Sequence, residues 1–164
     1  MQNNPDVIGL SKLIQKVPDF MEAKPQLEQY MTPVDIATFM LLNAFAEGDF
    51  KQEVVDFGCG TGRLAIGAAF LGAEVSAIDI DNEAMNIGKK YAEKKDLAIK
   101  WMEMPIQNWN RKIDTVIMNP PFGAQRPGAD REFIQKALEV ARRVWTIHLA
   151  DSSKFIDRFV EDNG

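Results

Sequence analysis

The 164-residue sequence predicts an α/β fold built on a doubly wound, mainly parallel sheet. Three observations lead to this prediction: candidate strands and helices alternate from residue 53 onward, most of the strands are near-continuous apolar runs, and short loops rich in Gly, Pro and Asn separate them. Apolar residues make up 46% of the chain and charged residues 26%, the balance of one globular domain. We therefore expect a single domain over residues 1–164, with N-terminal helices in 6–47 and the α/β core in 53–164.

The N-terminal region is expected to form two helices. In residues 6–17 the apolar side chains recur at helical spacing, and the lysines fall outside that spacing. The second helix should begin with Thr32 as its cap and with Pro33 in its first turn. It should run to about Glu47, because Gly48 is a helix-stop signal.

The α/β core is expected to contain five strands joined by right-handed crossovers. Gly72 should end the first core helix, and Asp81 and Asp130 are placed to cap the next two. The stretch around Asn108 is too short to predict a helix there. The expected strands are 53–57, 74–78, 98–103, 113–118 and 143–149. The expected helices are 63–71, 82–94 and 131–142, followed by an amphipathic helix over 151–160.

The composition excludes several classes of protein. One cysteine, Cys59, and one histidine, His148, rule out an internal disulfide and argue against a Cys/His zinc cage or a Ser-His-Asp triad, so we expect no metal site. The first residues lack the pattern of a signal peptide, and no apolar run reaches the ~18 residues of a membrane span. We therefore expect a cytoplasmic protein that is not in a membrane.

The net charge of -5 argues at first against nucleic acid as a partner, because phosphate binding usually leaves a basic footprint. The charge is unevenly distributed, however. Residues 119–150 contain five Lys or Arg side chains and three acidic ones, a local net charge of +2. An acidic total can therefore coexist with a basic pocket mouth.

The strongest chemical signal is a glycine turn between the first core strand and the next helix. Residues 54–62 read V-V-D-F-G-C-G-T-G, which places glycines at positions 58, 60 and 62. A dinucleotide fingerprint needs its third glycine at position 63, which is Arg63. The spacing G-x-G-x-G is instead typical of S-adenosylmethionine enzymes. The alternative is a tight turn that binds nothing, and Cys59 is interpreted as a small filler within it.

The second core strand ends in an acid suited to a ribose. Asp79 follows Gly58 by 21 residues, near the roughly 20 expected for a carboxylate that accepts hydrogen bonds from a ribose diol. Ile80 is assigned to the same cofactor site. Asp81 is better explained as a helix cap, and a capping role for both acids is the alternative. After the third strand, Met104 and Ile106 are expected to contact the adenine of the cofactor.

The fourth core strand ends in the sequence N-P-P-F, residues 119–122. An exocyclic amine or an amide nitrogen is a poor nucleophile, because its lone pair is delocalised. The side-chain carbonyl of Asn119 and the backbone carbonyl of Pro120 can accept its two N–H groups and direct the lone pair at a methyl donor. Pro121 continues the turn, and Phe122 can stack on a planar substrate. The alternative is a proline-rich turn that only closes the strand.

Together these motifs resemble a known family. Residues 56–62 look like motif I of the Rossmann-like S-adenosylmethionine-dependent methyltransferases, and N-P-P-F looks like the signature of their amino-methylating branch. The sequence L-E-Q-Y-x-T at residues 27–32 narrows the resemblance to the archaeal and eukaryotic small-subunit ribosomal RNA adenine-N6 methyltransferases. Eukaryotic members are called methyltransferase-like protein five. The resemblance covers nearly the whole chain.

The resemblance implies roles for individual residues. Gln29, Tyr30 and Thr32 would close over the methionine end of S-adenosylmethionine. Asp56, Gly58, Gly60 and Gly62 would hold its amino-acid portion, and Asp79 its ribose. Asn119, Pro120 and Phe122 would grip an adenine flipped out of structured RNA. Two residues depart from the family pattern, because Met31 stands where relatives carry proline and Pro105 replaces an acid that contacts adenine.

The resemblance also implies partners and a longer fold. Eukaryotic relatives need a small zinc-binding activator protein, Trm112-like, and we expect a similar partner here. The family fold has seven strands, so five predict a C-terminally truncated sheet whose last strand is an exposed edge carrying Trp145 and Ile147.

Three other functions stay open at this point. The N-P-P-F chemistry also serves N5 methylation of a protein glutamine. A non-catalytic scaffold that binds RNA or a partner could keep the same fold, although it would need neither the glycine turn nor Asp79. An NAD-dependent oxidoreductase fits worst, because Arg63 breaks the dinucleotide fingerprint.

Overall fold

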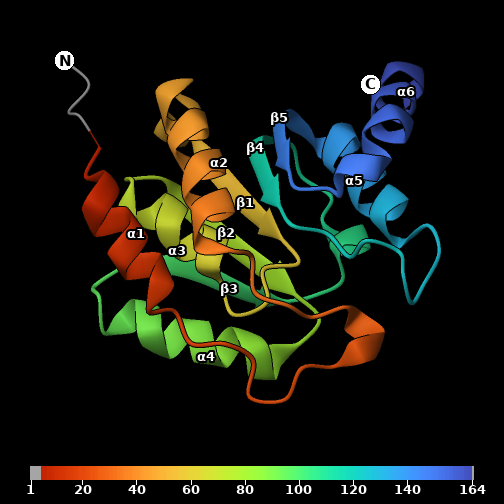
Figure 1. Ribbon diagram of the computed structural model, residues 1–164. Helices are drawn as coiled ribbons and strands as arrows, with labels where there is room; N and C mark the ends of the chain where they lie inside the picture. Colours follow the sequence, from red (N-terminus) through yellow and green to blue (C-terminus); the bar gives the residue numbers. More distant parts are fainter. Residues whose placement is uncertain (1–4, 164) are drawn as a thin grey trace.

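The computed structural model describes residues 5–163, and its centre is a five-stranded parallel sheet with the strand order β3-β2-β1-β4-β5 (Figure 1). Four parallel pairings build the sheet, with β1 at its centre between β2 and β4. The predicted α/β class and parallel sheet are therefore confirmed. The strands are β1 (Glu53–Phe57), β2 (Glu74–Asp79), β3 (Ile99–Glu103), β4 (Ile113–Met118) and β5 (Ala141–Thr146).

Helices cover both faces of the sheet. In Figure 1 the helices of residues 7–93 lie on one side of the sheet, and those of residues 129–163 lie with β5 on the other side. In the part of the chain that the structure describes, no helix combines the length and the apolar character that crossing a bilayer would require. The helices are α1 (Val7–Gln15), α2 (Val34–Ala46), α3 (Arg63–Phe70), α4 (Asn82–Glu93), α5 (Ala129–Val140) and α6 (Ser153–Asn163). Single 3₁₀ turns are η1 (Pro25–Leu27), η2 (Asp49–Lys51), η3 (Ile106–Asn108) and η4 (Ala150–Ser152).

The alternation of side chains along β1 separates two cores. Val54 faces a cluster that includes buried residues of α1, α2 and α3. Its neighbour Val55 faces the opposite cluster, which is completed by η3 and by Ile134 and Ala137 of α5. Burial on both faces explains why the strands are apolar without alternation, as a parallel sheet covered by helices requires.

Two predicted helix caps are wrong. Thr32 does not cap α2, because its hydroxyl accepts a hydrogen bond from the side chain of Asn119 and Pro33 takes the cap position instead. Asp130 lies inside the first turn of α5, and Gly128 with a φ of +83° precedes the helix. The Asp81 cap is confirmed, since its carboxylate accepts the backbone N–H of Glu83.

The boundary between α5 and β5 lies earlier than expected. The sequence predicted a helix over 131–142 and a strand over 143–149, whereas the helix ends at Val140 and β5 begins at Ala141 with no loop between them. An exposed arginine suits both the end of a helix and an edge strand. In the structure Arg142 and Arg143 lie exposed on the edge strand. The last predicted helix, 151–160, is observed as η4 and α6.

Gly88 of α4 provides a test of this packing, because a Cβ built at this position would overlap the backbone carbonyl of Thr61 in the glycine turn. Helix propensity alone predicts that Gly88→Ala stabilises the protein by roughly 0.5–1 kcal/mol. We expect the opposite sign, a loss of about 1–3 kcal/mol in the free energy of unfolding, because the close approach leaves no room for a methyl group.

Urea denaturation of the variant measures this difference. Lys89→Ala is the matched control, because Lys89 is the exposed neighbour on the same helix and its substitution should change stability by less than about 0.5 kcal/mol. Stabilisation by Gly88→Ala would show that α4 does not pack against the glycine turn in this way.

Candidate functional site

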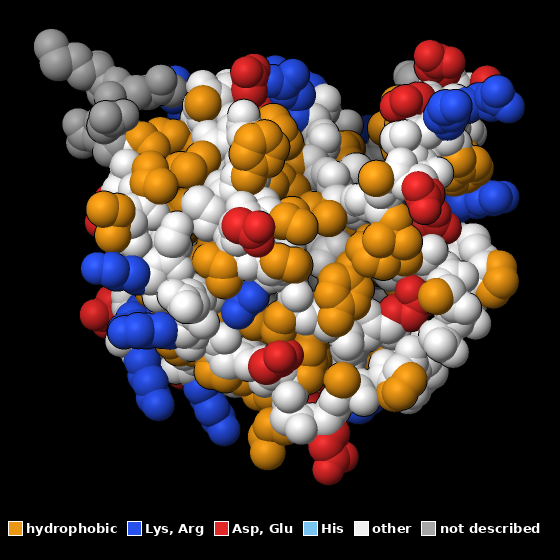
Figure 2. Space-filling model, in the orientation of Figure 1, with side chains coloured by type: hydrophobic (Ala, Val, Ile, Leu, Met, Phe, Trp, Pro, Cys, Tyr) orange, Lys and Arg blue, Asp and Glu red, His pale blue; other side chains and the backbone are white. Residues whose placement is uncertain are grey.

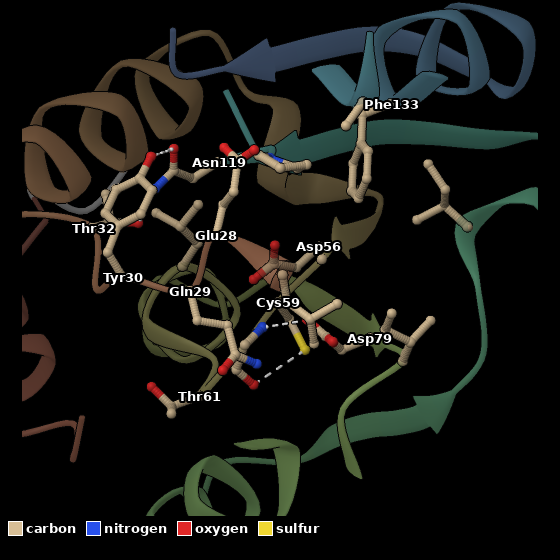
Figure 3. A pocket seen from close by; sticks show the side chains of 18 of the residues that line it. Glu28, Gln29, Tyr30, Thr32, Asp56, Cys59, Thr61, Asp79, Asn119 and Phe133 are labelled. Atoms are coloured by element: carbon tan, nitrogen blue, oxygen red, sulfur yellow. Dashed lines mark hydrogen bonds between the residues drawn. The ribbon is translucent and has the colours of Figure 1, made fainter. Parts of the chain in front are cut away.

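A pocket lies at the carboxyl ends of β1, β2 and β4, where the order of the strands reverses (Figure 3). Open parallel sheets bind ligands at this position. The pocket encloses about 270 Å³, slightly less than the roughly 300–1,000 Å³ of typical small-molecule sites. Its walls are the glycine turn, the ends of β2 and β4, the start of α5 and the α1–α2 linker, residues 16–33.

The shape of the glycine turn is set by its left-handed backbone and by hydrogen bonds to the end of β2. Gly60 has a φ of +54°, and a Cβ at this position would lie 2.8 Å from the Phe20 ring. Its N–H donates a hydrogen bond of 2.8 Å to Asp79 Oδ2. The backbone N–H groups of Gly58 and Cys59 both donate to the Ile78 carbonyl. These bonds tie the turn to the end of β2, so a ligand on the turn would lie beside Asp79.

Asp56 is a buried acid with spare hydrogen-bonding capacity. Its Oδ2 accepts the N–H of Ala65 at 3.0 Å, near the start of α3. Its Oδ1 has no hydrogen-bond partner among residues 5–163. Burial is the main reason that the pKa of Asp56 is raised to about 8. The hydrogen bond from Ala65 opposes this shift, and the nearby Asp79 carboxylate adds to it. An orphaned carboxylate oxygen on a pocket wall is suited to a cationic ligand group.

Asp79 lies at the end of β2 and closes the neighbouring wall. Its two oxygens accept the N–H groups of Gly60, at 2.8 Å, and of Asp81, at 2.9 Å. Burial raises the pKa of Asp79, and these backbone bonds oppose the shift. Each carboxylate oxygen can accept a second hydrogen bond, so the side chain keeps the capacity to bind two hydroxyl groups.

Asn119 stands immediately after β4, and both ends of its side-chain amide are engaged (Figure 3). Its Oδ1 accepts the Tyr30 hydroxyl at 3.0 Å, and its Nδ2 donates to Thr32 Oγ1 at 2.9 Å. Burial raises the pKa of Tyr30 to about 12, so the hydroxyl remains a donor at neutral pH. The Tyr30 ring also lies 5.2 Å from the Phe122 ring, centroid to centroid.

The α1–α2 linker docks at two further points. On the side of β2, Asp81 accepts hydrogen bonds from Gln29 Nε2 at 2.6 Å and from Lys24 Nζ at 2.9 Å. Burial acts to raise the pKa of Asp81, but these two bonds, the backbone N–H of Ala84 and the charge of Lys24 together lower it overall. On the side of β4, Glu28 binds the loop that contains Phe122. The linker therefore spans the pocket from β2 to β4.

Most of the residues that the sequence assigned to the site line this pocket. Those that do are Gln29, Tyr30, Thr32, Asp56, Gly58, Gly60, Asp79, Ile80, Asn119 and Pro121. Among the described residues, three assigned ones lie outside the lining. Gly62 precedes α3 with a φ of +84°, Pro120 is buried, and Phe122 packs on Tyr30. Met104, Pro105 and Ile106 form the wall beyond β3.

Sequence reasoning missed several lining residues. Phe20 and Phe133 reach the pocket from the α1–α2 linker and from α5, and they pack over Gly60 and Gly58. Nothing in the local sequence marks them, because their placement depends on tertiary packing. Glu28 was more accessible to prediction, since it stands within the L-E-Q-Y motif, but no role was assigned to it.

A family model and two relatives match most of this chain. Residues 31–147 match the family model of the methyltransferase small domain. The rRNA N(6)-adenosine-methyltransferase METTL5 of Danio rerio is 36% identical, with 93% of this chain and 79% of the relative covered. An uncharacterized protein of Methanocaldococcus jannaschii is 40% identical, with 86% of this chain and 70% of the relative covered.

A solved structure gives the same result. A Pyrococcus horikoshii protein proposed to be an RNA methyltransferase is 38% identical to this chain, with a TM-score of 0.91. The match covers 96% of this chain and 82% of that protein. The fold is thus the Rossmann-like fold of S-adenosylmethionine-dependent methyltransferases, and the chain belongs to the methyltransferase small domain family.

Proposed function

We propose that this protein is an S-adenosylmethionine-dependent methyltransferase that modifies the exocyclic N6 amine of adenine in structured ribosomal RNA. The observation that carries the proposal is the position of the Asn119 amide, which shares one pocket with the carboxylates of Asp56 and Asp79. The similarity to the Danio rerio enzyme, whose name specifies rRNA N6-adenosine, supports this choice of acceptor.

The lining residues fit the cofactor group by group. The free Oδ1 of Asp56 suits the ammonium of the methionine portion, and the spare capacity of Asp79 suits the ribose diol. Met104 and Ile106 offer an apolar wall to the adenine ring. When bound, S-adenosylmethionine supplies an electrophilic methyl group on a sulfonium.

Asn119 and Pro120 are proposed to hold the acceptor amine. Carbonyl oxygens that accept both N–H groups of the amine localise its lone pair and aim it at the methyl group. The chain then needs no strong base at this position. Phe122 would stack on the base, an interaction worth roughly 1–3 kcal/mol per base in other proteins.

Tyr30 occupies the two groups that the acceptor base would contact, Asn119 Oδ1 and the Phe122 ring. Its hydroxyl donates to Asn119 Oδ1, and its ring lies against Phe122. A flipped adenine would take over both interactions, because its amine also donates and its ring also stacks. We therefore propose that the base displaces Tyr30 when it binds.

The surface charge bears on how RNA is bound. In Figure 2, Lys and Arg side chains lie mainly at the rim of the face shown, and hydrophobic side chains gather over its centre. Four of the five basic residues in 119–150 form ion pairs, and the guanidinium of Arg131 lies over the Phe155 ring. The expected basic pocket mouth is therefore largely neutralised.

Pairing of these side chains favours RNA binding through base and shape contacts, or through a partner that adds positive charge. A Trm112-like activator, implied by the resemblance, remains a prediction. A cytoplasmic location is proposed with it, since the buried Cys59 is a free thiol.

Asn119→Ala tests the acceptor role, and an assay with separate RNA and protein substrates shows which of the two is methylated. Incubation with methyl-labelled S-adenosylmethionine and either ribosomal RNA or a protein extract measures transfer to each. We expect label in the RNA with the unchanged protein, and a loss of about 100- to 1,000-fold in the variant, because the group that orients the amine is gone.

Calorimetry should show that Asn119→Ala binds S-adenosylmethionine within about threefold of the unchanged protein. Asn110→Ala, at an exposed position outside the pocket, is the matched control. Retained transfer in Asn119→Ala would defeat the assigned role, and label confined to protein would favour N5 methylation of glutamine instead.

Asp56→Asn tests the fit of the cofactor through pH. Because the pKa of Asp56 is about 8, most of the side chain is protonated at pH 7, and a cationic ligand must drive the proton off. Binding at pH 7 should therefore release up to one proton, and the affinity of the unchanged protein should increase as the pH rises from 6 toward 8.

Calorimetry at pH 7 in buffers with different ionisation enthalpies measures this release. Asp56→Asn should lose it and should bind about 10- to 100-fold more weakly, as expected for a hydrogen bond between charged groups of roughly 1.5–3 kcal/mol. Equal proton release by both proteins would show that the ammonium does not bind at Asp56.

A further inference from the structure

Glu28 joins the α1–α2 linker to the loop after β4. One carboxylate oxygen accepts the backbone N–H of Phe122 at 2.8 Å, and the other accepts the N–H of Gln125 at 2.7 Å. The partners are 94 and 97 residues away in the sequence. A single side chain thus fixes two points of the loop that carries N-P-P-F.

The backbone conformation at position 28 favours glycine, which indicates that the glutamate is present for its side chain. Glu28 has a φ of +50°, and only one other non-glycine residue in 5–163, Asp96, has a positive φ. This left-handed conformation follows η1, where the N–H of Glu28 donates to the Pro25 carbonyl. Glycine adopts it without strain, so the local turn would favour glycine over glutamate.

The loop is also held by the Asn119 amide, the Phe122 ring and an Arg126 ion pair, but among residues 5–163 Glu28 is the one side chain that binds its backbone N–H groups. Residues 119–128 belong to no helix or strand, and the N–H groups of Phe122 and Gln125 are directed at the Glu28 carboxylate. The direction of the Pro120 carbonyl and of the Phe122 ring depends on this stretch of backbone. Two charge-assisted hydrogen bonds therefore set the geometry of the groups proposed to grip the base.

The same linker is anchored at the cofactor side of the pocket. Gln29, the next residue, donates to Asp81, and Asp81 in turn donates its backbone N–H to the proposed ribose ligand Asp79. Glu28 is thus the point where a linker fixed at β2 reaches the loop after β4.

We infer that Glu28 is a positioning residue for methyl transfer, which holds the N-P-P-F loop so that the Pro120 carbonyl and the Phe122 ring meet the acceptor base. The inference rests on the proposed function for the identity of the base. It concerns the acceptor side alone, since Glu28 does not touch Asp56 or Asp79 through any hydrogen bond in residues 5–163.

Glu28→Gln is the test variant, because the amide keeps the size of the side chain but has only one accepting oxygen. Glu22→Gln, exposed on the same linker, is the matched control. Hydrogen exchange of the unchanged protein and both variants should show at least tenfold faster exchange at Phe122 and Gln125 in Glu28→Gln alone. Transfer of labelled methyl to ribosomal RNA should show a kcat about 10- to 100-fold lower, with the cofactor Kd within twofold.

Glu28→Gly separates positioning from stability. It relieves the left-handed backbone but removes both hydrogen bonds, and these two effects on stability oppose each other. Assayed at a temperature at which every variant is folded, its kcat should fall as in Glu28→Gln. Unchanged exchange and unchanged kcat in Glu28→Gln would overturn the inference, and so would a loss of kcat that follows a loss of Tm. If the unchanged protein does not methylate RNA, the proposed function fails, while exchange at Phe122 and Gln125 still decides whether Glu28 holds the loop.

Discussion

Parallel pairing of β1 with both β2 and β4 is the constraint on which the site depends. The pairing sets Phe57 beside Ile78 on one side and beside Met118 on the other, so the chain leaves all three strands at one edge. The glycine turn directly follows β1, Asp79 is the last residue of β2, and Asn119 directly follows β4. Groups more than 60 residues apart in sequence thus share one pocket because of strand order alone.

The site's polar groups are also constrained by one another. Asp79 accepts a hydrogen bond from the glycine turn, and Asp81 accepts one from Gln29 of the linker. The Asn119 amide is bonded to Tyr30 and Thr32. Two buried side-chain atoms of the lining have no hydrogen-bond partner in the described residues, Asp56 Oδ1 and Arg63 Nε. Burying an unpaired carboxylate oxygen is unfavourable, and a ligand group that donates to it would remove that cost. The cofactor side of the pocket therefore keeps a side-chain oxygen that can accept a hydrogen bond, whereas the side-chain oxygen of Asn119 on the acceptor side is already bonded.

Much of this could be predicted from the sequence, because it depends on local signals. Apolar runs identified the strands, and glycine spacing identified the turn that lies against Asp79. What failed was decided by tertiary contacts. Thr32 has the properties of a helix cap, but a side chain 87 residues away takes its hydroxyl. The end of α5 was placed too late because arginines are equally suited to a solvated helix and to an exposed edge strand.

The place of Glu28 in the site could not be predicted for the same reason. Its partners are backbone amides, which leave no trace in the residue types at positions 122 and 125. Phe20 and Phe133, which line the pocket from the linker and from α5, are similar cases. Local patterns therefore gave the chemistry of the site, and only the folded chain gives the contacts that hold it together.

The contact between Tyr30 and Asn119 has a consequence for substrate choice. A ligand that occupies the acceptor side must first replace an internal hydrogen bond and a ring contact, so part of its intrinsic affinity is spent on opening the site. A mononucleotide has no other contacts from which to recover that free energy. A large folded polymer does, through surfaces distant from the reacting atom. The abundant pool of free adenine nucleotides in a cell would thus compete poorly for this site, even though each carries the same reactive amine.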